Sequence, residues 1–324
     1  MDTKARSTVF SSANPHALAI ILEASETKSI IAATDIFDIR GIKLWARDRP
    51  VSAELQRKLQ DRQLRDPLET CLVAEDGVTT ATLLQTAQAL MAEPTPLQRL
   101  LRPHAEKILR EIPQLPLHPV AQLLLTAGEA SRPEAFEHAV AAMALCGALM
   151  DAHGGNASEL RAAMLCGLLH DLGKAALPDA VLHKPAVLDE ADWRLMRQHA
   201  EAGARALQAA GRDLGVAVPV LDVAQQLARS HHERWDGQGY PEGLSGADIP
   251  LPARLMAVAD VFDALLSPRA WRPAMPLAQA RQTILDGRGR HFDPEVVDAF
   301  VECFEALADL ARRWDGGGPD DGPA

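Results

Sequence analysis

Two predicted apolar helices contain acidic or histidine side chains that could bind metal ions. Residues 162–169 are apolar on every side of a helix and lead directly into His170 and Asp171. Asp260 and Asp263 interrupt a second apolar stretch in the same way. A carboxylate in a protein interior costs several kcal/mol unless a cation or hydrogen bonds compensate it. A shared metal ion is an economical explanation for both places.

Histidines also extend the core-facing sides of other predicted helices. Glu134 and His138 lie one turn apart, and His199 and His231 each continue the apolar face of their own helix. A single histidine of this kind is usually an ordinary core residue, and the carboxylates could be helix caps or salt-bridge partners. The coincidence on separate helices of five histidines and three carboxylates favours one common site: His138, His170, His199, His231 and His232, with Glu134, Asp171 and Asp260.

The donor types restrict the chemistry of such a site. All the candidates offer an imidazole nitrogen or a carboxylate oxygen, and none offers a thiolate. This set fits a multinuclear iron or manganese centre better than a tetrahedral structural zinc site, although donor type alone leaves zinc open. Paired metals typically hold a hydroxide that attacks phosphorus while the ions stabilise the attacking and leaving oxygens. Hydrolysis of a phosphate ester is therefore the expected reaction.

These residues lie in a chain that we predict to be mainly α-helical, with a small N-terminal α/β module. The module, residues 1–78, contains a predicted hairpin around Gly41, a helix after Ser52 and an extended segment over 67–74. From residue 79 onward, apolar residues recur at helical spacing. We expect helices over 81–91, 97–112, 120–125, 135–150, 158–170, 189–210, 219–232, 252–266, 275–286 and 294–312.

The same patterns predict four regions along the chain. The module at 1–78 has no visible site chemistry, and a helical connector over 79–130 would transmit a signal or dimerise. The candidate ligands all lie in the third region, residues 131–313. The Gly- and Pro-rich tail at 314–324 has nothing to bury and is expected to be disordered.

Composition excludes several kinds of partner and location. The 324 residues are 47% hydrophobic and carry a formal charge of -11, which disfavours binding to a DNA or RNA polymer. Four widely spaced cysteines indicate reduced thiols. The N-terminus lacks the features of a secretory signal, and no run approaches the ~20 apolar residues of a membrane helix. We therefore expect a cytoplasmic protein that does not bind a membrane.

Two motifs resemble those of the HD-GYP subgroup of the HD phosphohydrolase superfamily. His170-Asp-Leu-Gly-Lys174 matches its HDxGK element, and residues 231–241, HHERWDGQGYP, match every fixed position of its HHExxDGxGYP element. The second motif is long and highly specific; we call residues 231–241 the GYP loop. Around these motifs, residues over roughly 131–312 follow the family's order and approximate spacing.

The resemblance implies an all-helical, metal-dependent phosphodiesterase that converts cyclic di-GMP to linear pGpG and, in some members, to GMP. It implies two or three divalent ions, with Asp171 and Lys174 as catalytic residues and Lys174 facing a substrate phosphate. Glu134 matches a carboxylate found in members with a third metal. The implied ligands are Glu134, His138, His170, Asp171, His199, His231, His232 and Asp260. The implied substrate contacts are Lys174, Arg269, Arg272, Gly239, Tyr240 and Pro241.

One segment departs from the family pattern. An RPYR-like sequence reads Arg269-Ala-Trp-Arg272 here, so both cations remain while the proline and tyrosine are replaced. An alternative is therefore a non-catalytic module that binds cyclic di-GMP, or a protein partner through the GYP loop. Another cyclic dinucleotide such as cGAMP, or a mononucleotide, is a further alternative substrate. A homodimer is also left open.

Overall fold

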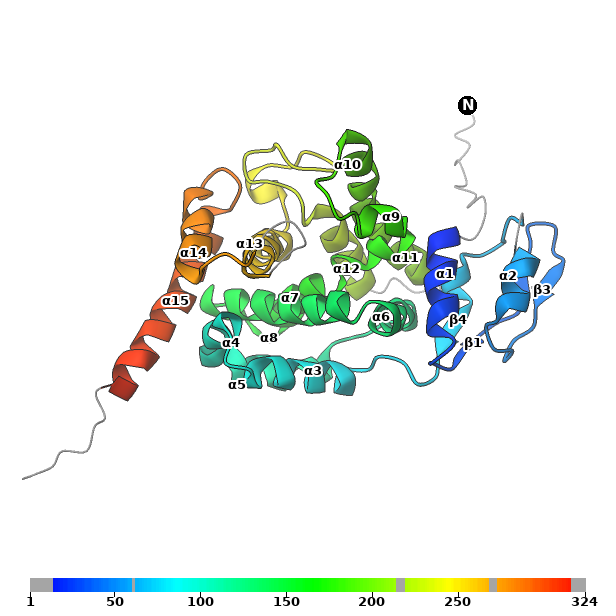
Figure 1. The fold of residues 1–324 in the computed structure, drawn as a ribbon, viewed down its shortest axis with the longest axis horizontal. Helices are drawn as coiled ribbons and strands as arrows, with labels where there is room; N and C mark the ends of the chain where they lie inside the picture. The colour runs from blue at the N-terminus through cyan, green and yellow to red at the C-terminus, as the bar shows by residue number, and fades with distance from the viewer. Residues whose placement is uncertain (1–13, 60–61, 214–218, 268–272, 316–324) are drawn as a thin grey trace, which may run out of the picture. The chain divides into compact units, whose positions relative to one another are not determined.

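The computed structural model describes residues 14–59, 62–213, 219–267 and 273–315, and these are mostly helical (Figure 1). Short strands occur only in the N-terminal part of the described chain, which confirms the predicted fold class. The chain forms two compact units, each assembled from several segments. The first unit contains Met1–Thr79, Pro116–Phe136 and Asp171–Gln225, and the second contains Thr80–Leu115, Glu137–His170 and Gln226–Ala324.

The strands of the first unit form two antiparallel pairs. β2 (Ile36–Phe37) pairs with β3 (Lys43–Trp45), and Gly41 has a φ of 78° in the turn between them, as the predicted hairpin requires. β1 (Ile30–Ala32) does not join this hairpin. It pairs instead with β4 (Leu72–Ala74), about forty residues away, with Ile30 opposite Ala74. This pairing buries Ile30 and Ala32 in the N-terminal core.

Helix α1 (Pro15–Ala24) was not predicted from the sequence. The side chain of Asn14 caps it by accepting hydrogen bonds from the backbone N–H groups of His16 and Ala17. An Asn-Pro pair is a helix-start signal that could have revealed it. α1 and β4 pack on α6 (Pro119–Ser131), while α2 (Ala53–Leu59) packs beside β3 (Figure 1).

The first unit also contains the HDxGK element. This element forms the 3-10 turn η4 (Leu172–Ala176), followed by α9 (Asp179–Leu182), α10 (Glu190–Met196) and α11 (Gln198–Asp213). η4 packs against α11, α6 and α1, and Ala175 lies against the N-terminal hydrophobic core. The N-terminal module and the HDxGK turn therefore share one packed interior.

The regular elements of the second unit are helices throughout its described residues. Its core has α13 (Leu251–Leu266) against α8 (Ala157–Leu169), with α14 (Leu277–Asp286) and α15 (Pro294–Asp315) packed on α13 (Figure 1). α7 (Pro133–Ala152) crosses α8 closely, since a Cβ on Gly167 would lie 2.4 Å from the Ala142 carbonyl oxygen. The unit also contains α3 (Thr80–Ala92), α4 (Pro96–Leu101) and α5 (Ala105–Glu111), and from Gln226 onward it includes the end of α12 (Pro219–Ser230).

Some predicted boundaries differ from the observed ones. The helix predicted over 97–112 is divided into α4 and α5 by a 3-10 turn that contains Pro103, which cannot continue the backbone hydrogen bonding. The helix predicted over 189–210 is divided at Arg197. α15 runs to Asp315, so the first two residues of the predicted tail are helical, and residues 316–324 lie outside the described part of the chain.

α7 is the one helix among the described residues whose length and composition would allow it to cross a membrane. Its most apolar 18-residue window is 72% buried inside the protein. This is the behaviour of a core helix, which is apolar because it is surrounded by other helices.

Candidate metal centre

Three of the predicted ligands share one local arrangement. The Nδ1 atoms of His170, His199 and His231 lie 2.8, 2.6 and 2.7 Å from the carbonyl oxygen of the residue three positions earlier in the chain. A carbonyl oxygen only accepts hydrogen bonds, so we assign the proton to Nδ1 in each case. The lone pair is then on Nε2, the nitrogen that a metal would bind. All three side chains are 1% exposed.

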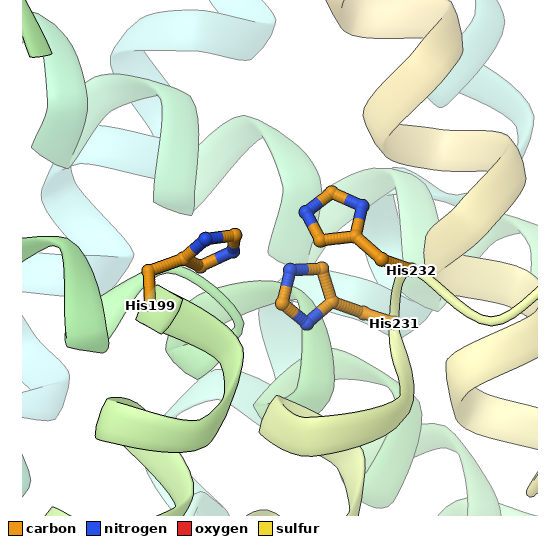
Figure 2. A group of neighbouring side chains, drawn as sticks. All are labelled: His199, His231 and His232. Carbon is orange, nitrogen blue, oxygen red and sulfur yellow. The ribbon is translucent and has the colours of Figure 1, made fainter. Parts of the chain in front are cut away.

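The ends of helices produce this arrangement. His170 directly follows α8 and caps its C-terminus, His231 directly follows α12, and His199 is in the first turn of α11. Figure 2 shows His199 on α11, and His231 and His232 on the segment that follows α12. At a helix end the backbone carbonyls are not all used within the helix, so a histidine can hydrogen-bond one of them.

His138 is held by a carboxylate instead of a carbonyl. Its Nδ1 lies 2.7 Å from Oδ2 of Asp263, and its Nε2 lies 3.7 Å from Oδ1 of Asp260. Both aspartates are on α13, one turn apart, and Asp263 is buried at 9% exposure. A carboxylate that accepts the Nδ1 proton orients the ring and makes Nε2 a better ligand. Asp260 thus stands as a ligand candidate and Asp263 as the residue that orients His138.

Four imidazole rings of the second unit lie in contact, each with the next. Ring centroids are 5.3 Å apart for His138 and His170, 5.2 Å for His170 and His231, and 4.1 Å for His231 and His232. His138 and His170 offer ligand nitrogens within 4.8 Å of each other, and so do His231 and His232. Helices α7, α8 and α12, distant in sequence, therefore bring four nitrogen donors together.

The first unit carries its own group of polar residues at the HDxGK turn. Nε2 of His199 lies 3.4 Å from Oδ1 of Asp171, and Nζ of Lys174 forms an ion pair with the same carboxylate. The close packing of η4 on α11 brings these residues together, because a Cβ on Gly173 would lie 1.9 Å from the His199 carbonyl oxygen. The glycine of the motif is thus required for the distance between Asp171 and His199.

The residues present are suited to bind metal ions. Histidines with Nε2 as the lone-pair nitrogen stand beside carboxylates in both units, and such groups could hold metals. The four cysteines are free and buried, and they are not members of either candidate group. Burial raises the thiol pKa of Cys303 to about 12, and it also raises the pKa of Cys146 and Cys166. The two candidate groups thus offer only nitrogen and oxygen atoms to a metal.

For three other predicted site residues the described part of the structure gives no contact with the candidate metal groups. Glu134 is exposed in the first turn of α7, so its role as a ligand stays a prediction. Arg269 and Arg272 lie outside the described residues. Asp263 was noted in the sequence as a buried aspartate, but its role beside His138 was missed. Its position three residues after Asp260, on the same face of an apolar helix, was the available signal.

The GYP loop folds back on the histidines that begin it. The backbone N–H of Tyr240 donates to the carbonyl oxygen of His232 at 3.2 Å, and their rings stack with centroids 4.8 Å apart. Gly239 permits this approach, since a Cβ there would lie 2.4 to 2.6 Å from backbone atoms of residues 232–234. The Tyr240–Pro241 peptide bond is cis. The predicted substrate contacts of Gly239, Tyr240 and Pro241 stay predictions.

Charged residues fix the middle of the GYP loop. Arg234 binds both carboxylate oxygens of Asp236, at 3.0 and 2.7 Å, and this pairing lowers the Asp236 pKa to about 2. The backbone N–H of Trp235 donates to the carbonyl oxygen of His291, and that of Asp236 donates to the carbonyl oxygen of Arg290. Burial, with a smaller contribution from Arg234, lowers the His291 pKa to about 4. His291 is therefore neutral near pH 7.

Replacing Asp263 with alanine is expected to weaken metal binding by roughly 10- to 100-fold, because His138 loses the acceptor that orients it. Asp263→Asn keeps an oxygen acceptor without the charge and should fall between the alanine variant and the wild type. Titration of the metal-free proteins with Mn²⁺, followed calorimetrically, measures the effect. Asp286→Ala, an exposed change on α14, is the control. An affinity unchanged in Asp263→Ala would contradict the orienting role.

Comparison with known proteins identifies relatives of this region. A model of the HD domain family matches residues 129–296. A protein named "Probable cyclic di-GMP phosphodiesterase" from Vibrio cholerae is 47% identical over 146 residues, 45% of this chain and 33% of that protein. The "3'3'-cGAMP-specific phosphodiesterase 2" of the same organism is 38% identical over 182 residues, 56% of this chain and 34% of that protein.

A solved structure of a HDG"Y"P protein from Bdellovibrio bacteriovorus superposes with a TM-score of 0.44 at 16% identity. The superposition covers 89% of this chain and 97% of that one. The matches to the curated relatives span about a third of those proteins' own length.

Proposed function

The chain belongs to the HD domain family, and we propose that it is a metal-dependent phosphodiesterase that hydrolyses cyclic di-GMP to linear pGpG. The observation that carries this proposal is the set of buried histidines whose Nδ1 atoms are hydrogen-bonded, together with the intact sequence of the GYP loop. Relatives named cyclic di-GMP phosphodiesterases support the choice of substrate. Further hydrolysis to GMP would be a second reaction of the same type.

The proposed ligands supply enough donors for two or three divalent ions. They are His138, His170, Asp171, His199, His231, His232 and Asp260, with Glu134 as an additional carboxylate for a third ion. Iron or manganese suits this combination of imidazole and carboxylate. When bound, such ions supply a hydroxide nucleophile from water near neutral pH and stabilise negative charge on the phosphate oxygens.

The protein's own side chains would prepare the site for this chemistry. Backbone carbonyls hold His170, His199 and His231 with Nε2 as the donor nitrogen, and Asp263 does the same for His138. Lys174 forms an ion pair with Asp171, and we propose that it stabilises a substrate phosphate. Arg269 and Arg272 would supply further cations. A cyclic dinucleotide has only two phosphates, so a local cluster of this size can bind it despite the chain's net negative charge.

The proposal is tested by incubating iron- or manganese-loaded protein, prepared anaerobically, with cyclic di-GMP and separating the products by chromatography. Time-dependent formation of pGpG is expected. Tight binding of cyclic di-GMP without product would instead indicate the non-catalytic signalling module. Parallel reactions with 3'3'-cGAMP measure the preference between dinucleotides, because one relative is named for that substrate. Faster hydrolysis of 3'3'-cGAMP than of cyclic di-GMP would replace the proposed substrate.

We also propose that the enzyme works in the cytoplasm, where reduced thiols persist. Its four cysteines are free and buried, which is consistent with a reducing compartment. A homodimer and a protein partner on the GYP loop are further proposals. The molecular mass in solution, measured by light scattering, would test the first of these.

A further inference from the structure

Glu233 is a buried carboxylate directly after the two histidines of the GYP loop. It is 2% exposed, and its two oxygens accept three backbone hydrogen bonds from consecutive residues. Oε1 accepts from Glu242 at 2.7 Å and from Gly243 at 3.1 Å, and Oε2 accepts from Leu244 at 3.1 Å. A carboxylate without such partners would be costly to bury. The Glu233 side chain therefore connects the beginning of the GYP loop to residues 242–244, which follow the loop.

A second connection lies beside the first. Tyr240 donates its backbone N–H to the His232 carbonyl oxygen and stacks its ring on the His232 imidazole, with an angle of 29° between the rings. Gly239 allows the two backbones to approach closely. Residues 239–244 are thus held against residues 232–234 by contacts on both sides of Glu233. The hydrogen bonds to Glu233 therefore hold the backbone just after Tyr240 in place, next to the residue that follows His232.

Surface contacts at the same place are weaker. The Glu242 side chain pairs with Arg229 at 3.2 Å, but these side chains are 40% and 38% exposed. An ion pair as exposed as this one contributes little because solvent screens it. The three hydrogen bonds to the buried Glu233 carboxylate are therefore a stronger link between residues 242–244 and residues 232–234 than this ion pair.

We propose that Glu233 is a positioning residue, which keeps the Tyr240 ring stacked on His232 and so fixes that imidazole for metal binding. The inference rests on the proposed function only in taking His232 as a metal ligand. The proposal gives Tyr240 the role of orienting the His232 imidazole as a metal ligand. The family resemblance implies Tyr240 only as a substrate contact, and the alternative function assigns the GYP loop to a protein partner.

Tyr240 is the only tyrosine in the chain, so it can report on the loop directly. Protein labelled with 3-fluorotyrosine gives a single fluorine NMR resonance, which the stacked His232 ring shifts away from the value in unfolded protein. Glu233→Gln has one acceptor oxygen and places an NH₂ group toward backbone donors. We expect its resonance to move toward the unfolded value or to broaden, and its Mn²⁺ affinity to fall by roughly 10- to 100-fold.

Glu242→Gln is the matched control, since it removes the exposed ion pair with Arg229 and keeps the backbone N–H that Glu233 binds. It should leave the resonance and the Mn²⁺ affinity as in the wild type. A cooperative urea-unfolding transition in each variant would show that the variant folds. Wild-type values for both readouts in Glu233→Gln would overturn the proposal, and so would weak Mn²⁺ binding with an unchanged resonance.

A second pair of variants covers the case in which Glu233→Gln does not fold. Tyr240→Phe keeps a ring to stack on His232 and should bind Mn²⁺ as the wild type does. Tyr240→Leu loses the ring and should bind it more weakly by the same factor as Glu233→Gln. Equal affinities for the two variants would refute the positioning role. All these measurements omit nucleotide, so they remain decisive even if the protein does not hydrolyse cyclic di-GMP.

Discussion

Asp171→Ala is expected to abolish hydrolysis of cyclic di-GMP, with a loss of at least about 100-fold in kcat/KM. Asp171 contacts His199 and Lys174, so one substitution removes a proposed ligand and the partner of a proposed phosphate-binding cation. The Asp171 side chain makes no capping hydrogen bond to η4, so the turn does not depend on it and the variant should still fold. Product formation and metal content, measured on the same sample, check both effects.

The matched control for this substitution is Asp179→Ala. Asp179 lies eight residues further along the same unit, is 72% exposed and pairs with Arg132 at 2.5 Å. Because the Asp179 carboxylate is exposed to solvent, the pair contributes about 1 kcal/mol or less, so activity and metal content should stay as in the wild type. If Asp171→Ala retained full activity with its metal content unchanged, the HDxGK aspartate would not be a ligand.

Gly173→Ala is expected to lower the free energy of unfolding by about 3 kcal/mol or more. The added Cβ would meet the His199 carbonyl oxygen at 1.9 Å and the Gly203 nitrogen at 2.4 Å. These are backbone atoms of α11, so relief requires η4 and α11 to separate. Separation would move Asp171 away from His199, and metal affinity should fall together with stability. Urea unfolding and Mn²⁺ titration measure the two effects.

Gly128→Ala provides the control for the change of glycine to alanine. Gly128 lies inside α6 in the same unit, and a Cβ there would meet no atom within 4 Å. Alanine is the better helix former by about 1 kcal/mol, so this variant should be slightly more stable than the wild type. A Gly173→Ala protein as stable as the wild type would show that the contact between η4 and α11 is looser than in the structure.

The GYP loop shows how much of the site follows from local sequence. The match of residues 231–241 to the family motif named His231, His232, Gly239 and Tyr240 as expected site residues, and they lie together within one short loop. The two motifs and the helical spacing from residue 79 onward likewise predicted the main helices that carry the ligands. Each of these features is encoded within a few turns of chain, where residue type and spacing limit the backbone conformation.

Contacts between distant segments could not be predicted in this way. The partner of β1 is β4 and not the neighbouring hairpin, because burial of Ile30 and Ala32 depends on a strand about forty residues away. Asp263 appears in the sequence as a second buried aspartate, and only its 2.7 Å contact with His138 on another helix shows what it does. Glu233 looks like one more charged residue of a motif until its hydrogen bonds to residues 242–244 are seen.

By itself, the sequence determined which residues could bind metal and the family to which the chain belongs, because donor types and motif spacing are properties of the linear chain. Only the tertiary structure decided which histidine nitrogen carries the lone pair, which residues orient the donors, and that the N-terminal module packs on the HDxGK turn. These features depend on carbonyls, carboxylates and apolar surfaces brought together by packing. Spacing along the chain does not specify which of those groups meet.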